Sequence, residues 1–279
     1  MDLQTRITDS DVSITVNDIT VSYKDQGDGN IPIIFIHGFP FSYEMWNPQI
    51  DFFRKTHRVI AYDIRGFGRS TAGSTKPTID LYADDLIGFM DALNIHKSII
   101  CGLSMGGYIV LNAIYRYPER FSGIVLSDTQ CIADTAEVKE KRFESIAQIE
   151  ERGKEDFASS FVKNAFSELS QTKKLEAIEE IKDTILSTSN ETITAALKAL
   201  AERQEMCATL PNITVPTLVI CGEQDKVTPV KQAEFLVTNI GSAEIKIIEG
   251  AGHLSNLEQP EVFNQSVADF VGKLIDRPL

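Results

Sequence analysis

Ser104 stands in a five-residue pattern, Gly102-Leu103-Ser104-Met105-Gly106, that could place a nucleophile on a sharp turn. The apolar residues 99–101 before it predict a strand, and residues 108–115 after it are compatible with a helix. Glycines lack a Cβ, so two of them flanking the serine would let chain segments pack closely around such a turn. The pattern alone is common, and a serine that merely caps a glycine-rich turn is the alternative. The strand before and the helix after favour a nucleophilic serine.

A serine hydroxyl is a poor nucleophile without a base, and histidine is the usual one. The chain contains only four histidines, at positions 37, 57, 96 and 253. His57 and His96 have charged neighbours, which is typical of surface positions. His253 follows a predicted strand in Gly250-Ala251-Gly252-His253, where the glycines would let a loop fold sharply over a sheet edge. We predict His253 as the base, the alternative being an ordinary loop histidine.

Asp225 is the candidate for orienting that base. It follows the apolar strand pattern of residues 217–221. A carboxylate at such a position can hold an imidazole in the required tautomer and stabilise the imidazolium. The alternative is that Asp225 caps a helix that begins near Val230.

The elements that must position these residues alternate between strand and helix patterns. A hairpin is predicted over residues 12–23, and further strands over 31–36, 57–63, 98–103, 121–126, 217–221 and 244–248. Helices are predicted over residues 46–54, 79–93, 104–117, 230–240 and 260–274. This alternation predicts an α/β fold with a mostly parallel sheet. All three candidates follow strands, and the carboxyl ends of parallel strands are where ligands bind in such sheets.

The pattern changes between about residues 131 and 209. Strand signals vanish, and amphipathic helical periods take their place. We interpret residues 131–209 as a helical cap inserted into a core domain made of residues 1–130 and 210–279.

Composition narrows the classes of function. The net charge of −13 and the lack of any lysine- or arginine-rich block argue against nucleic-acid binding. No apolar run is long enough to span a bilayer, and residues 1–6 lack the features of a signal peptide. The four cysteines are widely spaced and include no CxxC pair, so metal-site spacing is absent and we expect no metal. We expect no cofactor. We also expect reduced thiols and a cytoplasmic location.

The sequence resembles the α/β-hydrolase superfamily over nearly its whole length. Its order of Ser104, Asp225 and His253 is the order of that fold. Within it, the chain is most similar to small carboxylesterases and enol-lactone hydrolases. The motifs that carry the resemblance are His37-Gly38-Phe39-Pro40, residues 63–70, Gly102 to Gly107, residues 127–129, residues 222–229 and Gly250 to His253.

The resemblance implies an ester or lactone hydrolase that works through an acyl-enzyme on Ser104. The oxyanion hole would use the backbone N–H groups of Met105 and Phe39, since Pro40 has none to donate. Ser104 argues against haloalkane dehalogenases and epoxide hydrolases, which place an aspartate at the elbow. Cofactor-free perhydrolases also carry a proline right after the oxyanion residue, as this chain does at Pro40, so a perhydrolase activity stays an alternative. A ligand receptor on the same fold is a second alternative. Asp128 is a rival to Asp225, because family members vary in where the acid sits.

We expect the substrate to be a small-molecule ester or lactone, and the chain to be a monomer or a homodimer. The cap should supply much of the acyl pocket. The candidate lining residues are Phe41, Trp46, Phe143 and Phe161. Phenylalanines on amphipathic helices are also common as simple packing residues.

Overall fold

The computed structural model describes residues 12–275, so the predicted lack of a leader in residues 1–6 lies outside the described residues. The strands are β1 (Val12–Val16), β2 (Ile19–Gln26), β3 (Ile33–Ile36), β4 (Val59–Tyr62), β5 (Ser98–Leu103), β6 (Phe121–Ser127), β7 (Thr217–Gly222) and β8 (Ala243–Ile248). They form one sheet in the order β1-β2-β4-β3-β5-β6-β7-β8. Pairing is antiparallel at β1–β2 and β2–β4 and parallel elsewhere, which confirms the predicted α/β class.

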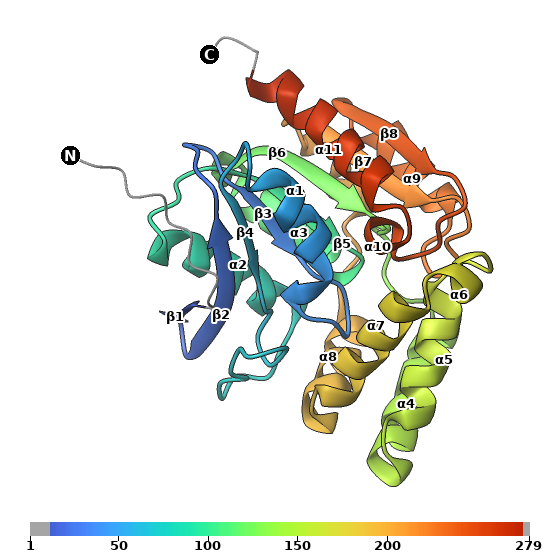
Figure 1. Ribbon diagram of the computed structural model, residues 1–279. Coiled ribbons are helices and arrows are strands. Elements are labelled where there is room, and N and C mark those ends of the chain that lie inside the picture. The colour runs from blue at the N-terminus through green and yellow to red at the C-terminus, as the bar shows by residue number, and fades with distance from the viewer. Residues whose placement is uncertain (1–11, 276–279) are drawn as a thin grey trace.

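Helices flank this sheet, some in the connections between its strands and two, α10 and α11, after the last strand. They are α1 (Asn47–Phe53), α2 (Ile79–Ala92), α3 (Met105–Arg116), α9 (Val230–Asn239), α10 (Ser255–Glu258) and α11 (Pro260–Ile275), with 3₁₀ turns η1 (Tyr43–Trp46), η2 (Pro118–Arg120) and η3 (Cys207–Asn212). Helices α1 and α11 contact each other in front of the sheet in Figure 1, whereas α2 and α3 pair behind it. Covering both faces explains why β3 is a continuous apolar run with every residue buried.

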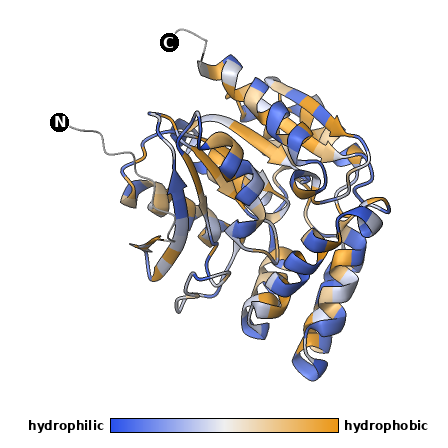
Figure 2. Ribbon diagram, in the orientation of Figure 1, coloured by the Kyte–Doolittle hydropathy of each residue, from blue (hydrophilic) through white to orange (hydrophobic). Residues whose placement is uncertain are grey.

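Five helices lie between β6 and β7 and form a separate group at the lower right of Figure 1. They are α4 (Ala136–Arg152), α5 (Glu155–Ala165), α6 (Ser170–Lys173), α7 (Leu175–Ser187) and α8 (Asn190–Glu202). Thr135 begins α4 by accepting the N–H of Val138, and Gly153 ends it at φ +88°. Apolar and hydrophilic residues alternate on these helices in Figure 2, as the helical periods of the sequence predict.

Most boundaries differ from the sequence predictions by one or two residues. The helix predicted over residues 46–54 is found as α1, within one residue at each end, and the short turn η1 precedes it. The largest difference is in the predicted hairpin, whose second strand β2 continues to Gln26 rather than ending at Tyr23. Pro48 stands near the start of α1, where its missing N–H has no helical partner to lose. No helix within the described part of the chain is long and apolar enough to cross a membrane.

Candidate active site

Ser104 occupies a strained turn between β5 and α3. Its backbone has φ 53° and ψ −113°, a conformation that non-glycine residues rarely adopt. A Cβ on Gly102 would collide with the backbone of Gly106, and one on Gly106 would collide with the carbonyl oxygen of Ile36. The two flanking glycines therefore permit the turn, as the sequence pattern predicts.

The three predicted side chains meet at the carboxyl end of the sheet. Ser104 Oγ lies 2.9 Å from His253 Nε2, and His253 Nδ1 lies 2.9 Å from Asp225 Oδ2. His253 comes from the loop after β8 and Asp225 from the loop after β7. Ser104 is 8% exposed, and the other two side chains are buried. In this line, the serine hydroxyl can donate to Nε2 while Nδ1–H donates to the carboxylate.

Asp225 is held in place by its own loop. Its Oδ1 accepts the N–H groups of Val227 at 2.7 Å and Thr228 at 2.9 Å, and the Thr228 hydroxyl donates to Oδ2 at 2.7 Å. Residue 229, not Asp225, is the N-cap of α9, so the helix-cap interpretation is wrong. Burial favours the neutral acid, but the charge and hydrogen bond of His253 outweigh it and lower the pKa of Asp225.

The pKa of His253 moves the opposite way. Burial of the ring lowers it, but the charge and hydrogen bond of Asp225 outweigh burial, and the carboxylates of Asp128 and Glu258 add to the upward shift. The net pKa lies above that of an ordinary histidine. The imidazolium that forms when a base takes a proton is therefore stabilised here.

Asp128, the rival acid, lies next to this line without orienting the histidine. Its carboxylate accepts the hydroxyls of Ser127 at 2.7 Å and Ser255 at 2.5 Å, and the N–H of Gly222 at 2.8 Å. Burial and the nearby charge of Asp225 raise its pKa to about 7. The geometry therefore pairs His253 with Asp225.

Asp128, Cys221 and Asp225 bring three possible metal-ligand atoms close together. Both carboxylates already accept hydrogen bonds from protein groups. A thiol must lose its proton to bind a metal, and burial raises the pKa of Cys221 strongly. The donor set thus fits a hydrogen-bonded carboxylate pair better than a metal.

Two buried N–H groups face no partner beside Ser104. Within residues 12–275, the backbone N–H groups of Phe39 and Met105 donate to no protein acceptor. Phe39 follows Gly38, whose ideal Cβ position is 3.3 Å from the Ser104 Cβ, so this loop passes directly over the nucleophile. Buried N–H groups are nearly always hydrogen-bonded, and an unpaired pair at this position suits a bound oxyanion.

His37 supports the loop that carries Phe39, a role that was not predicted from the sequence. Its Nδ1 lies 2.8 Å from the carbonyl oxygen of Gly38, and its Nε2 accepts the N–H of Ile64 at 2.9 Å. Burial lowers the pKa of His37 to about 4, so the ring is neutral and holds the loop through its two hydrogen bonds. Its position at the end of β3, beside a glycine, was the available signal.

An aromatic cluster joins α5 to the loop of Phe39. The Phe161 ring centroid lies 5.6 Å from that of Phe41 and 6.3 Å from that of Phe39, and Phe157 lies 6.2 Å from Phe39. Edge-to-face contacts of this kind add to the stabilisation from burial. Phe41 and Phe161 are therefore placed beside the predicted oxyanion hole.

Two of the predicted lining residues lie elsewhere. Trp46 is fully buried in the core, because η1 turns it toward the sheet. Its ring centroid lies 4.8 Å from that of Phe35 and 5.9 Å from that of Phe263. Phe143 is 47% exposed on α4, which buries Ile146 and Ile149 instead. We exclude both from the candidate pocket.

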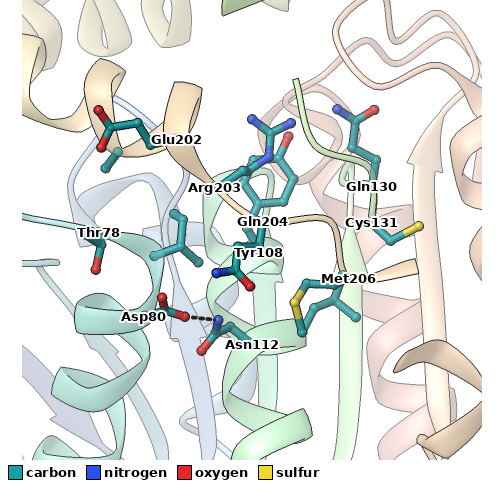
Figure 3. A pocket seen from close by; sticks show the side chains of 13 residues that line it. Thr78, Asp80, Tyr108, Asn112, Gln130, Cys131, Glu202, Arg203, Gln204 and Met206 are labelled. Carbon is teal, nitrogen blue, oxygen red and sulfur yellow. Dashed lines mark hydrogen bonds between the residues drawn. The ribbon is translucent and has the colours of Figure 1, made fainter. Parts of the chain in front are cut away.

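The prediction of four reduced cysteines is wrong, because Cys131 and Cys207 form a disulfide. Cys131 stands where the chain enters the five helices α4–α8, and Cys207 stands where it leaves them. A cavity of about 130 Å³ lies beside this bridge, and the side chains of Tyr108, Arg203 and Met206 line it in Figure 3. No residue of the Ser104 line contributes to that cavity.

Comparison with known proteins agrees with this architecture. A family described as the alpha/beta hydrolase fold matches residues 31–260. The 3-oxoadipate enol-lactonase 2 of Acinetobacter baylyi is 30% identical over 91% of this chain and 94% of its own length. A thermophilic esterase from Thermogutta terrifontis superposes with a TM-score of 0.90 at 32% identity, covering 95% of this chain and 99% of its own. The enol-lactonase from Burkholderia xenovorans LB400 gives 0.87 at 28% identity, covering 94% and 100%. Because the family matches most of the length of this chain, the chain belongs to the alpha/beta hydrolases.

Proposed function

We propose that this chain is a carboxylic ester hydrolase that cleaves an ester or lactone of a small molecule through an acyl-enzyme on Ser104. The observation that carries the proposal is the continuous line from Ser104 Oγ through His253 to Asp225, with two links of 2.9 Å. The enol-lactonases and the esterase that resemble the chain add independent support for the substrate class.

In the proposed reaction, Ser104 Oγ attacks the substrate carbonyl carbon while His253 Nε2 accepts the hydroxyl proton. The negative charge that develops on the carbonyl oxygen is held by the N–H groups of Phe39 and Met105. His253 then gives its proton to the leaving alkoxide, and the carbonyl re-forms as an acyl ester on Ser104. A water that loses its proton to His253 attacks this ester, and the returning proton regenerates the serine hydroxyl.

Charge and aromatic packing favour a neutral acyl group. The charges that act on His253 come from the carboxylates of Asp225, Asp128 and Glu258. A carboxylate on the substrate would meet this negative potential, whereas an apolar chain can pack against Phe161, which is partly exposed and contacts the fully buried Phe41 ring. We therefore propose a neutral ester or lactone, bound beneath a cap formed by residues 131–209.

The cytoplasmic location stays a prediction, and the Cys131–Cys207 bridge weighs against it. Stable disulfides are typical of oxidising compartments and rare in the cytosol. Trapping thiols in intact cells before lysis distinguishes the two: a reduced pair agrees with the cytoplasm, and a bridged pair agrees with an oxidising compartment.

A substrate screen with the purified protein tests the proposed function. Esters of graded acyl length, neutral and carboxylate-bearing lactones, and peracid formation are compared in the wild type and in Ser104→Ala. Steady-state turnover of an ester or lactone that disappears in Ser104→Ala supports the proposal. Tight binding with at most one turnover indicates a receptor instead, and turnover that survives in Ser104→Ala excludes the mechanism.

A further inference from the structure

Glu258 is a buried carboxylate that the proposed reaction does not use. It lies at the C-terminal end of α10, and only 1% of the residue is exposed. Its Oε1 accepts the N–H of Gly252 at 2.9 Å and that of Leu254 at 3.3 Å. These are the residues immediately before and after His253. One carboxylate oxygen therefore fixes the backbone on both sides of the base.

The other oxygen of the same carboxylate reaches the cap. Glu258 Oε2 accepts the N–H of Ser167 at 2.9 Å, just beyond the end of α5. Two residues earlier, the carbonyl oxygen of Ala165 accepts the backbone N–H of His253 itself at 2.7 Å. The base-bearing loop and the end of α5 are thus joined by hydrogen bonds in both directions.

Gly252 permits this close approach. A Cβ at that position would lie 2.7 Å from the Ala165 oxygen and 2.7 Å from the Ser167 nitrogen, closer than real Cβ contacts allow. The cap backbone therefore packs directly on the loop that carries His253. Helix α5 also carries Phe161, which contacts the Phe41 ring. A displacement of α5 would therefore shift both the aromatic cluster and the loop that carries His253.

We propose that Glu258 is a positioning residue that couples the cap to His253, so that the base reaches its working position only when the end of α5 is seated on its loop. This rests on the proposed function of Ser104 and His253. In a bound complex, an acyl group that packs well against Phe161 would stabilise the seated cap and with it the aligned base. Acyl recognition and proton transfer would then be linked through Glu258.

Glu258→Gln tests the coupling, because it keeps one acceptor oxygen but replaces the other with an N–H₂ group. The amide oxygen can still accept from Gly252 and Leu254, whereas the N–H₂ group would oppose the N–H of Ser167. We expect kcat per active serine to fall about 10- to 100-fold, the cost of misplacing a catalytic group by about 1 Å, with KM changed much less. Active serines are counted by titration with a fluorophosphonate.

Glu223→Gln is the matched control. Glu223 accepts the N–H of Gly250 at 3.1 Å in the same loop, but that contact involves no cap residue. Its kcat should stay within about twofold of the wild type, as expected of a surface substitution. A fall in Glu258→Gln equal to that in Glu223→Gln, or a loss of folded protein with kcat per active serine unchanged, overturns the coupling.

Gly252→Ala provides an independent test should Glu258→Gln not fold. The added methyl must push Ala165 and Ser167 away and lies 3.0 Å from Glu258 Oε1, while none of the catalytic side chains is substituted, so kcat should again fall. Gly241→Ala, where no atom lies within 4 Å of the added methyl, is its control. Unchanged kcat in Gly252→Ala overturns the coupling. Wild-type protein inactive on every ester and lactone instead refutes the proposed function.

Discussion

Removal of the bridge between Cys131 and Cys207 should cost the fold several kcal/mol. The perturbation is the double substitution Cys131→Ser/Cys207→Ser, or reduction of the wild type. The two cysteines are 76 residues apart in sequence and tie together the two ends of the helical segment α4–α8. Without the bridge, the unfolded chain regains the freedom of that whole loop, whereas the folded state loses one side-chain contact.

Loop-closure entropy sets the magnitude. For a loop of 76 residues, the chain-entropy relation gives a stabilisation of about 4.5 kcal/mol at 25 °C. Removal of native disulfides typically costs about 2 to 5 kcal/mol, so the value from this relation lies near the top of that range. With a urea dependence of about 3 kcal/mol per molar, the unfolding midpoint should fall by about 1.5 M.

Urea unfolding followed by circular dichroism measures this shift. The midpoint of the wild type in reductant should match that of the double variant, and the variant itself should not respond to reductant. Denatured wild type without reductant should show two free thiols, those of Cys101 and Cys221. Four free thiols would show that Cys131 and Cys207 are not bridged, and a wild-type midpoint that reductant leaves unchanged would show that the bridge does not stabilise the fold.

Four further outcomes follow from the geometry of the site. Asp225→Asn should lower kcat by roughly four orders of magnitude, since the histidine tautomer is lost, whereas Asp128→Asn should cost far less; equal losses would contradict the assignment of the acid. The raised pKa of His253 places the rise of kcat/KM with pH above that of an ordinary histidine, because the base must be neutral. Asp128→Asn removes one carboxylate that raises that pKa, so the rise should move to lower pH; a shift to higher pH would contradict the stated electrostatics. Phe161→Ala should raise KM for a neutral apolar ester by about tenfold, and equal KM for all acyl groups would exclude Phe161 from the pocket. Gly102→Ala should destabilise the fold by at least about 1 to 3 kcal/mol in a urea titration, because its methyl would meet the α3 backbone.

Sequence alone predicts the features of this molecule that are set locally. Strands buried on both faces are continuous apolar runs, and the glycines around Ser104 mark its turn. Because β5, β7 and β8 run parallel in one sheet, the residues that follow them lie at the same edge of that sheet. This is why the positions of Asp225 and His253 along the chain were informative.

Features decided by contacts between distant segments were not predictable in the same way. The direction of Trp46 depends on its packing against Phe263, more than 200 residues later. The pairing of Cys131 with Cys207 depends on the path of five intervening helices. No local pattern around Glu258 indicates that its carboxylate bridges the base and the cap.

The most direct test of the central proposal is to trap the acyl group on the enzyme. A turned-over ester is mixed with the protein, the reaction is quenched in acid, and the peptides are mapped by mass spectrometry. We predict one acyl adduct on the peptide that contains Ser104, and neither adduct nor turnover in Ser104→Ala. An adduct on another residue, or undiminished turnover by Ser104→Ala, would contradict the central proposal.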